Sequence, residues 1–330
     1  MTKYLVDFAI GSRFGQESGL GEHGILQICS REIKQLSEPR ASGIAPNKSG
    51  VCFMATGNSP LAPLNPEEQS RAYAKYYRDP VPPDAEQLAR MDAPCDPSKA
   101  IFPEQMNDLL NPGDLQMEIG WCNLPNGAGF IANRNLYRDV TAEMIEWWFA
   151  WHPLEDLRYR IWYPPQHAGV SLSPESRKRI LNPDIPVSEK NWGVTHYVTE
   201  DCDCGMENIE ITFLSPGDFG FDMTRWKEPY VSAFVGGFGW SSPATKTDHI
   251  IKAPSLMCHI FRQAPGGLEH RTRFWMGYRM SQGKPELSLP PGITVPAMAV
   301  QGLARHNVRE FSNLGILLPE IYGEFGGSVA

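Results

Sequence analysis

The predicted order of secondary-structure elements is the feature that most restricts the fold. Segments with apolar–polar alternation recur along the chain, and a long amphipathic helix follows them, beginning near residue 297. A period of two is typical of strands that cover one face of a sheet, and helical apolar spacing indicates one buried helix face. Strands are predicted at 157–163, 194–200, 207–214, 230–238, 254–262 and 269–280. Strands in series with a final helix indicate an α+β fold on an antiparallel sheet.

Two further elements precede these strands. The stretch 115–137 contains two extended runs around the Pro-Asn-Gly sequence at 125–127, which predicts a β-hairpin. Thr141 is then predicted to cap a helix with acidic residues in its first turns. The apolar stripe of this helix consists of Met144, Trp147, Trp148 and Trp151. Such a stripe favours core packing, and His152 at its end is interpreted as a C-terminal helix cap.

The N-terminal part of the chain has a different character. Residues 1 to about 60 are rich in Gly and Ser and show weak periodicity. Short helices are predicted at 66–78 and, within a proline-punctuated connector, at 84–91. We therefore place the boundary between an N-terminal accessory region, 1–100, and a main domain, 101–330, near residue 100.

Composition and charge argue against several classes of function. The formal net charge is 30 − 38 = −8 and no Lys/Arg block stands out, which argues against a nucleic-acid-binding protein. No stretch approaches the roughly 18 apolar residues that a membrane-spanning helix needs. The beginning of the sequence lacks the apolar core and cleavage site of a secretory signal. The protein is therefore expected to be cytoplasmic and not bound to membranes.

The cysteines are scattered along the chain. Their number, seven, is odd, which argues against a disulfide framework and fits a reducing compartment. Cys202 and Cys204 flank Asp203, and a Cys-x-Cys pair can bind a metal. No second cysteine pair or nearby histidine completes a thiolate site, so we interpret both thiols as incidental.

His306 and Glu310 lie four residues apart in the predicted C-terminal helix. Residues at this spacing share one helix face, so an imidazole and a carboxylate would project together and can hold a divalent metal. Leu303, Phe311 and Leu314 follow the helical apolar period near the pair, which indicates an inward-facing position. The alternative is a solvated pair, because His-x-x-x-Glu arises often by chance.

Other residues of ligand type extend this pair. His167 ends the run RYRIWYPPQH, and His196 and Glu200 share one face of the strand VTHYVTED. The candidate four-residue site consists of His167, Glu200, His306 and Glu310. Spacing along the chain does not by itself bring these residues together. Neither a P-loop nor a Gly-x-Ser-x-Gly elbow is present, so nucleotide-phosphate binding and a serine-hydrolase triad are unsupported.

Four stretches of the chain resemble the diacetylphloroglucinol hydrolase and phloretin hydrolase family. They are LPNGAGFIANRNLY, EMIEWWFAWHPLEDLRYRIWYPPQH, EHRTRFWMGY and ARHNVREFSNLGILLP, and the Trp-rich block is the most specific. The resemblance implies a Bet v 1-like (START-type) helix-grip domain, in which a curved antiparallel sheet wraps a long C-terminal helix and leaves an apolar cavity. It also implies that a smaller N-terminal region supports a homodimer.

The resemblance further implies the chemistry of the site. The family binds one zinc ion through two histidines and two glutamates, and hydrolyses the carbon–carbon bond between a phenolic ring and an acyl group. The positions that match its ligands are His167, Glu200, His306 and Glu310. Tyr159 matches a tyrosine placed beside the substrate, and His259 matches a further active-site histidine, with His249 as the alternative. The implied substrate is a small aromatic ketone.

One position departs from the family pattern. Three residues after the first zinc-binding histidine, the diacetylphloroglucinol enzyme has an asparagine that contacts the substrate, and this chain has Val170. Valine can neither donate nor accept a hydrogen bond through its side chain. The substrate is therefore expected to differ from diacetylphloroglucinol.

The implied reaction is of the retro-Claisen type. Protonation of the acyl-bearing ring carbon allows the ring to leave as a stabilised enolate, while zinc polarises oxygens and lowers the pKa of water. Tyr159 and His259 would move protons or hold phenolic oxygens. A catalytic zinc usually has three protein ligands and a water, so four ligands require a fifth position. The alternatives are a zinc-assisted cyclase or decarboxylase acting on an aromatic polyketide, and a non-catalytic binder of an aromatic ligand.

Overall fold

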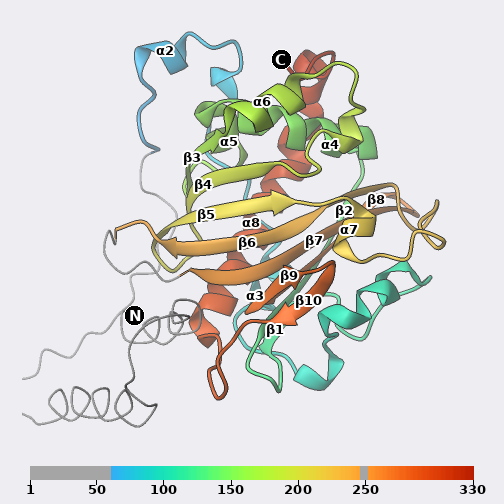
Figure 1. Ribbon diagram of the computed structural model, residues 1–330. Helices are drawn as coiled ribbons and strands as arrows, with labels where there is room; N and C mark the ends of the chain where they lie inside the picture. The colour runs from blue at the N-terminus through green and yellow to red at the C-terminus, as the bar shows by residue number, and fades with distance from the viewer. Residues whose placement is uncertain (1–60, 246–251) are drawn as a thin grey trace, which may run out of the picture. The chain divides into compact units, whose positions relative to one another are not determined.

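The computed structural model describes residues 61–245 and 252–330. An eight-stranded antiparallel sheet with the order β1-β2-β8-β7-β6-β5-β4-β3 forms its centre (Figure 1). The strands are β1 (Gly120–Asn123), β2 (Gly129–Tyr137), β3 (His167–Leu172), β4 (Thr195–Asp201), β5 (Met206–Phe213), β6 (Ala233–Pro243), β7 (Ala253–Ala264) and β8 (Gly267–Met276). A separate two-stranded ribbon consists of β9 (Tyr278–Ser281) and β10 (Lys284–Leu287).

Helices and single helical turns lie between and around the strands. The α-helices are α2 (Pro66–Gln69), α3 (Ala85–Ala89), α4 (Ala142–Trp151), α5 (Asp156–Trp162), α6 (Pro174–Leu181), α7 (Pro216–Phe219) and α8 (Ala297–Phe325). The 3₁₀ turns are η2 (Ala74–Tyr76), η3 (Pro97–Lys99), η4 (Pro103–Leu110), η5 (His152–Leu154) and η6 (Val187–Glu189). Each helix in the described ranges is too short or too polar to cross a lipid bilayer.

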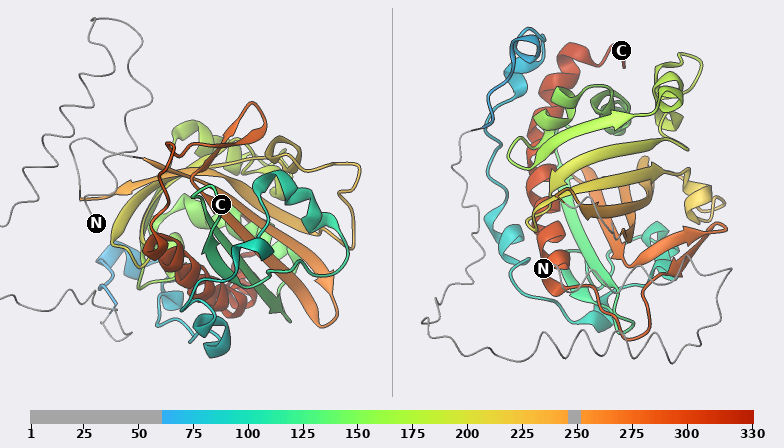
Figure 2. Two further views of the ribbon diagram at one scale, coloured as in Figure 1. Left: turned by 90° about the horizontal axis from the view of Figure 1, so that it is seen from below. Right: turned by 60° about the vertical axis from the view of Figure 1, so that its left-hand side comes forward.

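The long helix α8 runs along the inner side of the curved sheet (Figures 1 and 2). It contacts β1, β2, α4 and α5. Its buried face includes Val300, Ala304, Val308 and Phe311, whose spacing of four, four and three residues follows the helical period. The sheet therefore buries one apolar stripe of a single helix, and the predicted α+β helix-grip fold is confirmed.

The connection between β2 and β3 determines where the site lies. β2 pairs with β8 in one half of the sheet, whereas β3 is the edge strand of the other half. The chain crosses between them through α4, η5 and α5, and α5 packs against β3 and α8. His167, the first residue of β3, consequently lies beside α8 instead of at a solvent-exposed edge.

The prediction of a strand at 157–163 is wrong, because these residues form most of α5. The sequence LRYRIWY alternates apolar and polar residues, which suggested a period of two. In the structure the apparently polar Arg158 is buried: it pairs with Glu155 and lies over the ring of Trp151 at 4.5 Å. Burial on nearly all sides of a short helix removes the periodic signal on which the prediction depended.

The predicted helix at 66–78 is also wrong as a single element. The chain forms α2, with Asn65 and Glu68 in a capping box, and then the separate turn η2. Tyr73 packs edge-on against Trp151 at 5.3 Å, and Tyr76 against Phe325 at 6.5 Å. Docking of these two rings on the main domain decides the local backbone here, because helix propensity alone is a weak determinant.

Most other predicted elements are confirmed. β1 and β2 form the hairpin around 125–127, and Thr141 accepts a hydrogen bond from the backbone N–H of Met144 at the start of α4. The ring of His152 bonds to the carbonyl of Trp148 at the end of that helix. The four strands predicted between 194 and 262 are found with shifted ends, α3 lies within 84–91, and α8 begins at Ala297. The strand predicted at 269–280 is wrong as a single element, because β8 ends at Met276 and β9 begins at Tyr278 in the separate ribbon.

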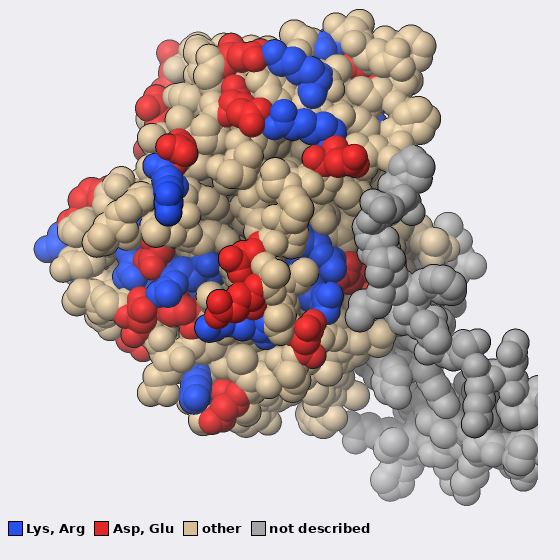
Figure 3. Space-filling model, turned by 180° about the vertical axis from the view of Figure 1, so that it is seen from behind, with Lys and Arg blue, Asp and Glu red and all other residues tan. Residues whose placement is uncertain are grey.

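The described part of the accessory region, residues 61–100, packs on α8 and on β1. Arg78 pairs with Glu320 at 2.7 Å and Lys75 with Glu324 at 2.6 Å, while the indole of Trp121 donates to the carbonyl of Met91. Acidic and basic side chains lie interspersed on the face of the molecule seen from behind (Figure 3). The role of this region in dimer formation stays a prediction.

Candidate metal centre

The four predicted ligand residues come together between the β3–β4 edge of the sheet and α8. His167 lies opposite Glu200 in the antiparallel pairing of β3 with β4. His306 and Glu310 lie on successive turns of α8, on its buried face. All four side chains are buried, with exposed fractions between 1% and 8%. Two strands of the sheet and one helix thus contribute ligand-type atoms. These atoms fall into two groups that share His306, one with His167 and Glu310 and the other with Glu200 and Cys202.

The distances between these side chains suit ligands of one ion better than hydrogen-bonded partners. Nε2 of His167 lies 3.7 Å from Oε2 of Glu200 and 3.6 Å from Oε2 of Glu310. Nε2 of His306 lies 3.7 Å from the same Glu310 oxygen. Such separations are long for hydrogen bonds. Zinc–ligand bonds of about 2.0–2.2 Å would place ligand atoms about 3.3–3.6 Å apart around a tetrahedral ion.

Hydrogen bonds orient both imidazoles toward this point. Nδ1 of His167 lies 3.2 Å from the backbone carbonyl of Tyr159, and Nδ1 of His306 lies 3.0 Å from Oε1 of Gln166. Both acceptors can only accept, so each Nδ1 carries the proton and each Nε2 keeps its lone pair. The Nε2 atom of His167 is buried without a hydrogen-bond partner. An orphaned lone pair of this kind fits a metal ligand.

The electrostatics of the site also favour a cation. Burial lowers the pKa of His306 well below its usual value and lowers that of His167 despite the nearby Glu200 carboxylate. Burial raises the pKa of Glu310 well above its ordinary range and raises that of Glu200 as well. Neutral histidines give no charge to compensate two buried carboxylates. A divalent ion would supply it, so the residues present fit a metal.

Hydrogen bonds hold the two carboxylates in place. Nδ2 of Asn307 donates to Oε1 of Glu310 at 3.2 Å, which leaves Oε2 facing the histidines. The thiol of Cys202 donates to Oε1 of Glu200 at 3.4 Å. These contacts fix which oxygen of each carboxylate faces the centre.

Cys202 is a residue of the site that the sequence analysis set aside. Its sulfur belongs with Glu200 and His306 to one group of closely spaced ligand-type atoms, while His167, His306 and Glu310 form a second group. The sequence offers no second cysteine pair that would complete a thiolate site. The usable signal was its position two residues beyond Glu200, because residues two apart on an extended chain share one side.

Tyr159 reaches the centre from α5, not from a strand. Its hydroxyl donates to Oε2 of Glu200, and its ring lies parallel to that of His167 with the centroids 4.3 Å apart. Burial, and secondarily Glu200, raises the pKa of Tyr159 well above its usual value. The hydroxyl therefore stays protonated and is a donor at the edge of the site.

His259 lies in a different cluster. Its Nδ1 is 2.9 Å from Nε2 of His270 and 3.0 Å from the hydroxyl of Thr272. Its ring packs on Phe311 at 4.8 Å, and within the described ranges none of its hydrogen bonds or ring contacts reaches the four ligand-type residues. Burial lowers its pKa to about 3. The alternative, His249, lies outside the described residues.

Val170 faces the same interior as His167 because of a β-bulge. The register of β3 against β4 shifts between His167 and Gly169, so residues three apart both point inward. Val170 is 7% exposed and lies opposite Val198, in an apolar cluster that also contains Phe213. The interior next to the candidate metal centre is therefore apolar at this position.

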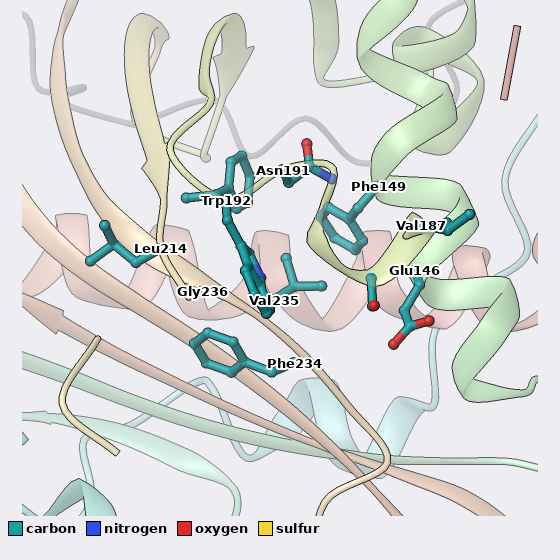
Figure 4. A pocket seen from close by; sticks show the side chains of 11 residues that line it. Glu146, Phe149, Val187, Asn191, Trp192, Leu214, Phe234, Val235 and Gly236 are labelled. Carbon is teal, nitrogen blue, oxygen red and sulfur yellow. The ribbon is translucent and has the colours of Figure 1, made fainter. Parts of the chain in front are cut away.

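A pocket lies close to this interior, between α4, the segment 187–192 and strands β5 and β6 (Figure 4). Phe149 and Phe213 form part of its lining, together with Asn191. The ring of Phe149 packs edge-on against Trp162 at 5.6 Å, and Trp162 packs edge-on against His167 at 5.2 Å. The rings of Phe149 and Trp162 thus lie between the pocket and His167.

Comparisons with known proteins identify the family to which the chain is similar. The family model for the DAPG hydrolase PhiG domain matches residues 101–323. Phloretin hydrolase of Eubacterium ramulus is 35% identical over 263 residues, which cover 78% of this chain and 92% of that protein. A 2,4-diacetylphloroglucinol hydrolase of Pseudomonas sp is 27% identical over 279 residues, covering 79% and 91%.

Among solved structures, the crystal structure of Ara h 8.0201 aligns with 60% of this chain and all of that chain, at 10% identity and a TM-score of 0.29. The family assignment follows from the family model, which covers most of the main domain, and from the similarity to phloretin hydrolase over most of both chains. The chain belongs to the DAPG hydrolase PhiG domain family.

Proposed function

We propose that this protein is a zinc-dependent hydrolase that cleaves the carbon–carbon bond between a phenolic, phloroglucinol-type ring and an acyl group. The observation that carries the proposal is the buried, unpaired Nε2 of His167, which faces two glutamates in the company of His306. Relatives of the chain are named as hydrolases of phloretin and of 2,4-diacetylphloroglucinol.

The balanced reaction adds water across the bond between ring and acyl group. The acyl carbon gains hydroxyl and becomes a carboxylic acid, while the ring carbon gains a proton and keeps the bonding electrons until it does so. Bound zinc would act as a Lewis acid toward oxygen atoms and lower the pKa of water. Zinc is the metal that the family resemblance implies, and two imidazoles and two carboxylates are ligands that it accepts.

The residues of this chain have separate tasks in the proposed reaction. The four residues that would hold the metal, by their mutual distances, are His167, Glu200, His306 and Glu310. The protonated hydroxyl of Tyr159 donates to Glu200 in the structure. In the reaction it would donate instead to a substrate oxygen, or deliver the proton that the ring carbon needs. The aromatic layer of Phe149 and Trp162 would exclude bulk water from the site. His259 would act on the site through Phe311, whose ring packs on His259 and on Trp162.

Metal and product analysis tests the proposal. The purified protein is expected to contain about one zinc per chain and to convert an acylphloroglucinol into a carboxylic acid and the deacylated ring. Chelator-treated protein is the control. Release of carbon dioxide or a cyclised product would instead indicate a decarboxylase or cyclase, and zinc-free active protein would contradict the metal assignment.

The homodimer and the cytoplasmic location belong to the same proposal. The homodimer rests on the family resemblance, and the cytoplasmic location rests on the absence of a disulfide pattern in the cysteines. Light scattering of the full chain would measure its mass in solution. A mass equal to that of one chain at all concentrations would contradict the homodimer.

Substrate preference is expected to depend on Val170. An oxygen placed against this buried valine would remain without a partner, at a cost of about 1–3 kcal/mol. We therefore expect poor activity on diacetylphloroglucinol relative to a bulkier acylphenol, and a partial reversal in Val170→Asn. The measurement is kcat/KM for both substrates in both variants.

Val170→Ala is the matched control, since it removes bulk without adding a polar group. It should not improve the relative activity on diacetylphloroglucinol. The same substrate preference in wild type and Val170→Asn would show that this side chain does not contact the substrate, even though the β-bulge turns it inward.

A further inference from the structure

We infer that Gln166 and Asp203 form a hydrogen-bond network that fixes the orientation of His306, the ligand-type histidine on α8. This inference rests on the proposed metal-binding function and deepens it, because neither residue belongs to the four proposed ligands. The hydrogen bonds of this network connect His306 to Gln166, Gln166 to Asp203, and Asp203 to Arg309 on α8.

The hydrogen bonds of this network have only one consistent direction. Asp203 has carboxylate oxygens that can only accept, so Nε2 of Gln166 donates to Oδ1 of Asp203 at 2.7 Å. That bond fixes the orientation of the amide, and Oε1 of Gln166 must then face Nδ1 of His306 at 3.0 Å. The amide oxygen accepts a hydrogen bond from the Nδ1–H group, which leaves Nε2 free to bind a metal.

Asp203 is itself held firmly. Nη1 of Arg309 contacts its two oxygens at 2.7 and 2.6 Å, and Nε of Arg305 lies 3.9 Å away. Arg309 lies three residues beyond His306, on the same helix. The carboxylate of Asp203 therefore ties Gln166 to α8, and the amide of Gln166 in turn holds the imidazole of His306. A closed ring of contacts of this kind restricts rotation of the imidazole.

Backbone conformation and hydrogen bonds hold the turn that contains Asp203 close to Gln166. Asp203 has a left-handed backbone conformation, with φ of 62°. The side chain of Asp201 accepts from the N–H groups of Cys204 and Gly205, and the N–H of Asp201 donates to the carbonyl of Gln166 at 2.9 Å. The turn is thereby tied to the same residue whose side chain Asp203 holds.

Close packing on α8 gives a second, independent sign of a fixed arrangement. Gly302 lies one helical turn before His306, and a Cβ atom there would come within 2.4 Å of the carbonyl oxygen of Cys202. Only a residue without a side chain lets the turn rest directly on the helix. The turn thus packs directly against α8, one helical turn from His306.

The experiment measures zinc affinity by competition with a chromophoric chelator, with the full-length protein. Gln166→Met keeps the length of the side chain but removes its hydrogen bonds, and Asp203→Ala removes the far end of the network. Each variant is expected to bind zinc about 10–100-fold more weakly, the usual effect of losing a partner that orients a ligand. The melting temperature of the metal-free protein separates this effect from a loss of folding.

Arg78→Ala is the matched control. Arg78 pairs with Glu320 of α8 at 2.7 Å and is half exposed, so its removal breaks an ion pair on the same helix without touching Gln166, Asp203 or His306. Its zinc affinity should equal that of wild type. Wild-type affinity in both Gln166→Met and Asp203→Ala would overturn this inference alone, whereas a wild-type protein that binds no zinc would overturn the metal site and this inference together. Should Gln166→Met fail to fold, Asp203→Ala, which leaves the amide in place, decides the question.

Discussion

Replacement of His306 by alanine is expected to remove most of the bound zinc and, with it, the hydrolysis of acylphenols. His306 belongs to both groups of closely spaced ligand-type atoms in the described part of the chain, so its loss affects either arrangement. It also leaves Oε2 of Glu310 without one of its two neighbouring imidazoles. Loss of a ligand should weaken zinc binding by more than about 100-fold, beyond the effect of losing an orienting partner. Elemental analysis and chelator competition measure this directly.

His196→Ala is the matched control for that experiment. His196 is also a buried histidine and lies on the same strand as Glu200, but its Nε2 bonds to the side chain of Asn191 at 3.0 Å. This variant should keep its zinc, although it loses some stability. Full zinc occupancy in His306→Ala, or equal zinc loss in the two variants, would contradict the assignment of His306 as a ligand.

Tyr159→Phe is expected to keep the fold and the bound zinc and to lower turnover of acylphenols by roughly 10²-fold or more. Phenylalanine retains the ring that stacks on His167 and removes only the hydroxyl that donates to Glu200. Burial holds this hydroxyl in its protonated form, so it can donate to a substrate oxygen or to the ring carbon. Steady-state kinetics in excess zinc separates this loss from any change in metal affinity.

Tyr163→Phe provides the comparison. The ring of Tyr163 also lies near the ligand-type histidines, with its centroid 6.3 Å from His167 and 6.2 Å from His306. Its hydroxyl forms no hydrogen bond to Glu200, so the variant should turn over substrate at nearly the wild-type rate. Unchanged rates in Tyr159→Phe would remove this tyrosine from the mechanism and leave it a packing role against His167.

Local patterns in the sequence predicted much of this fold. The apolar spacing of α8, the Thr141 cap and the Pro-Asn-Gly turn depend on contacts between residues close in the chain, and each was found as expected. The pairing of His306 with Glu310 is equally local, because four residues of helix place both side chains on one face. Propensity, capping and periodicity act over a few residues, so a single sequence is enough to reveal them.

Tertiary structure decided what brings these elements together. The opposition of His167 and Glu200 arises from the pairing of β3 with β4, and a bulge in that pairing turns Val170 inward. α5 forms where alternation predicted a strand, because its polar Arg158 packs on the buried ring of Trp151 and pairs with Glu155. Long-range pairing, burial and register depend on residues distant in the chain, whose meeting no local pattern encodes.

The same division applies to the candidate metal centre. The sequence by itself determined the types of residue, two imidazoles and two carboxylates, and which of them share an element. Only the tertiary structure showed that Cys202 joins them, that His259 lies in another cluster, and that Gln166 and Asp203 connect His306 to Arg309. Ligand chemistry is a property of single side chains, whereas the orientation of each ligand depends on hydrogen bonds that form only when distant segments of the chain pack together.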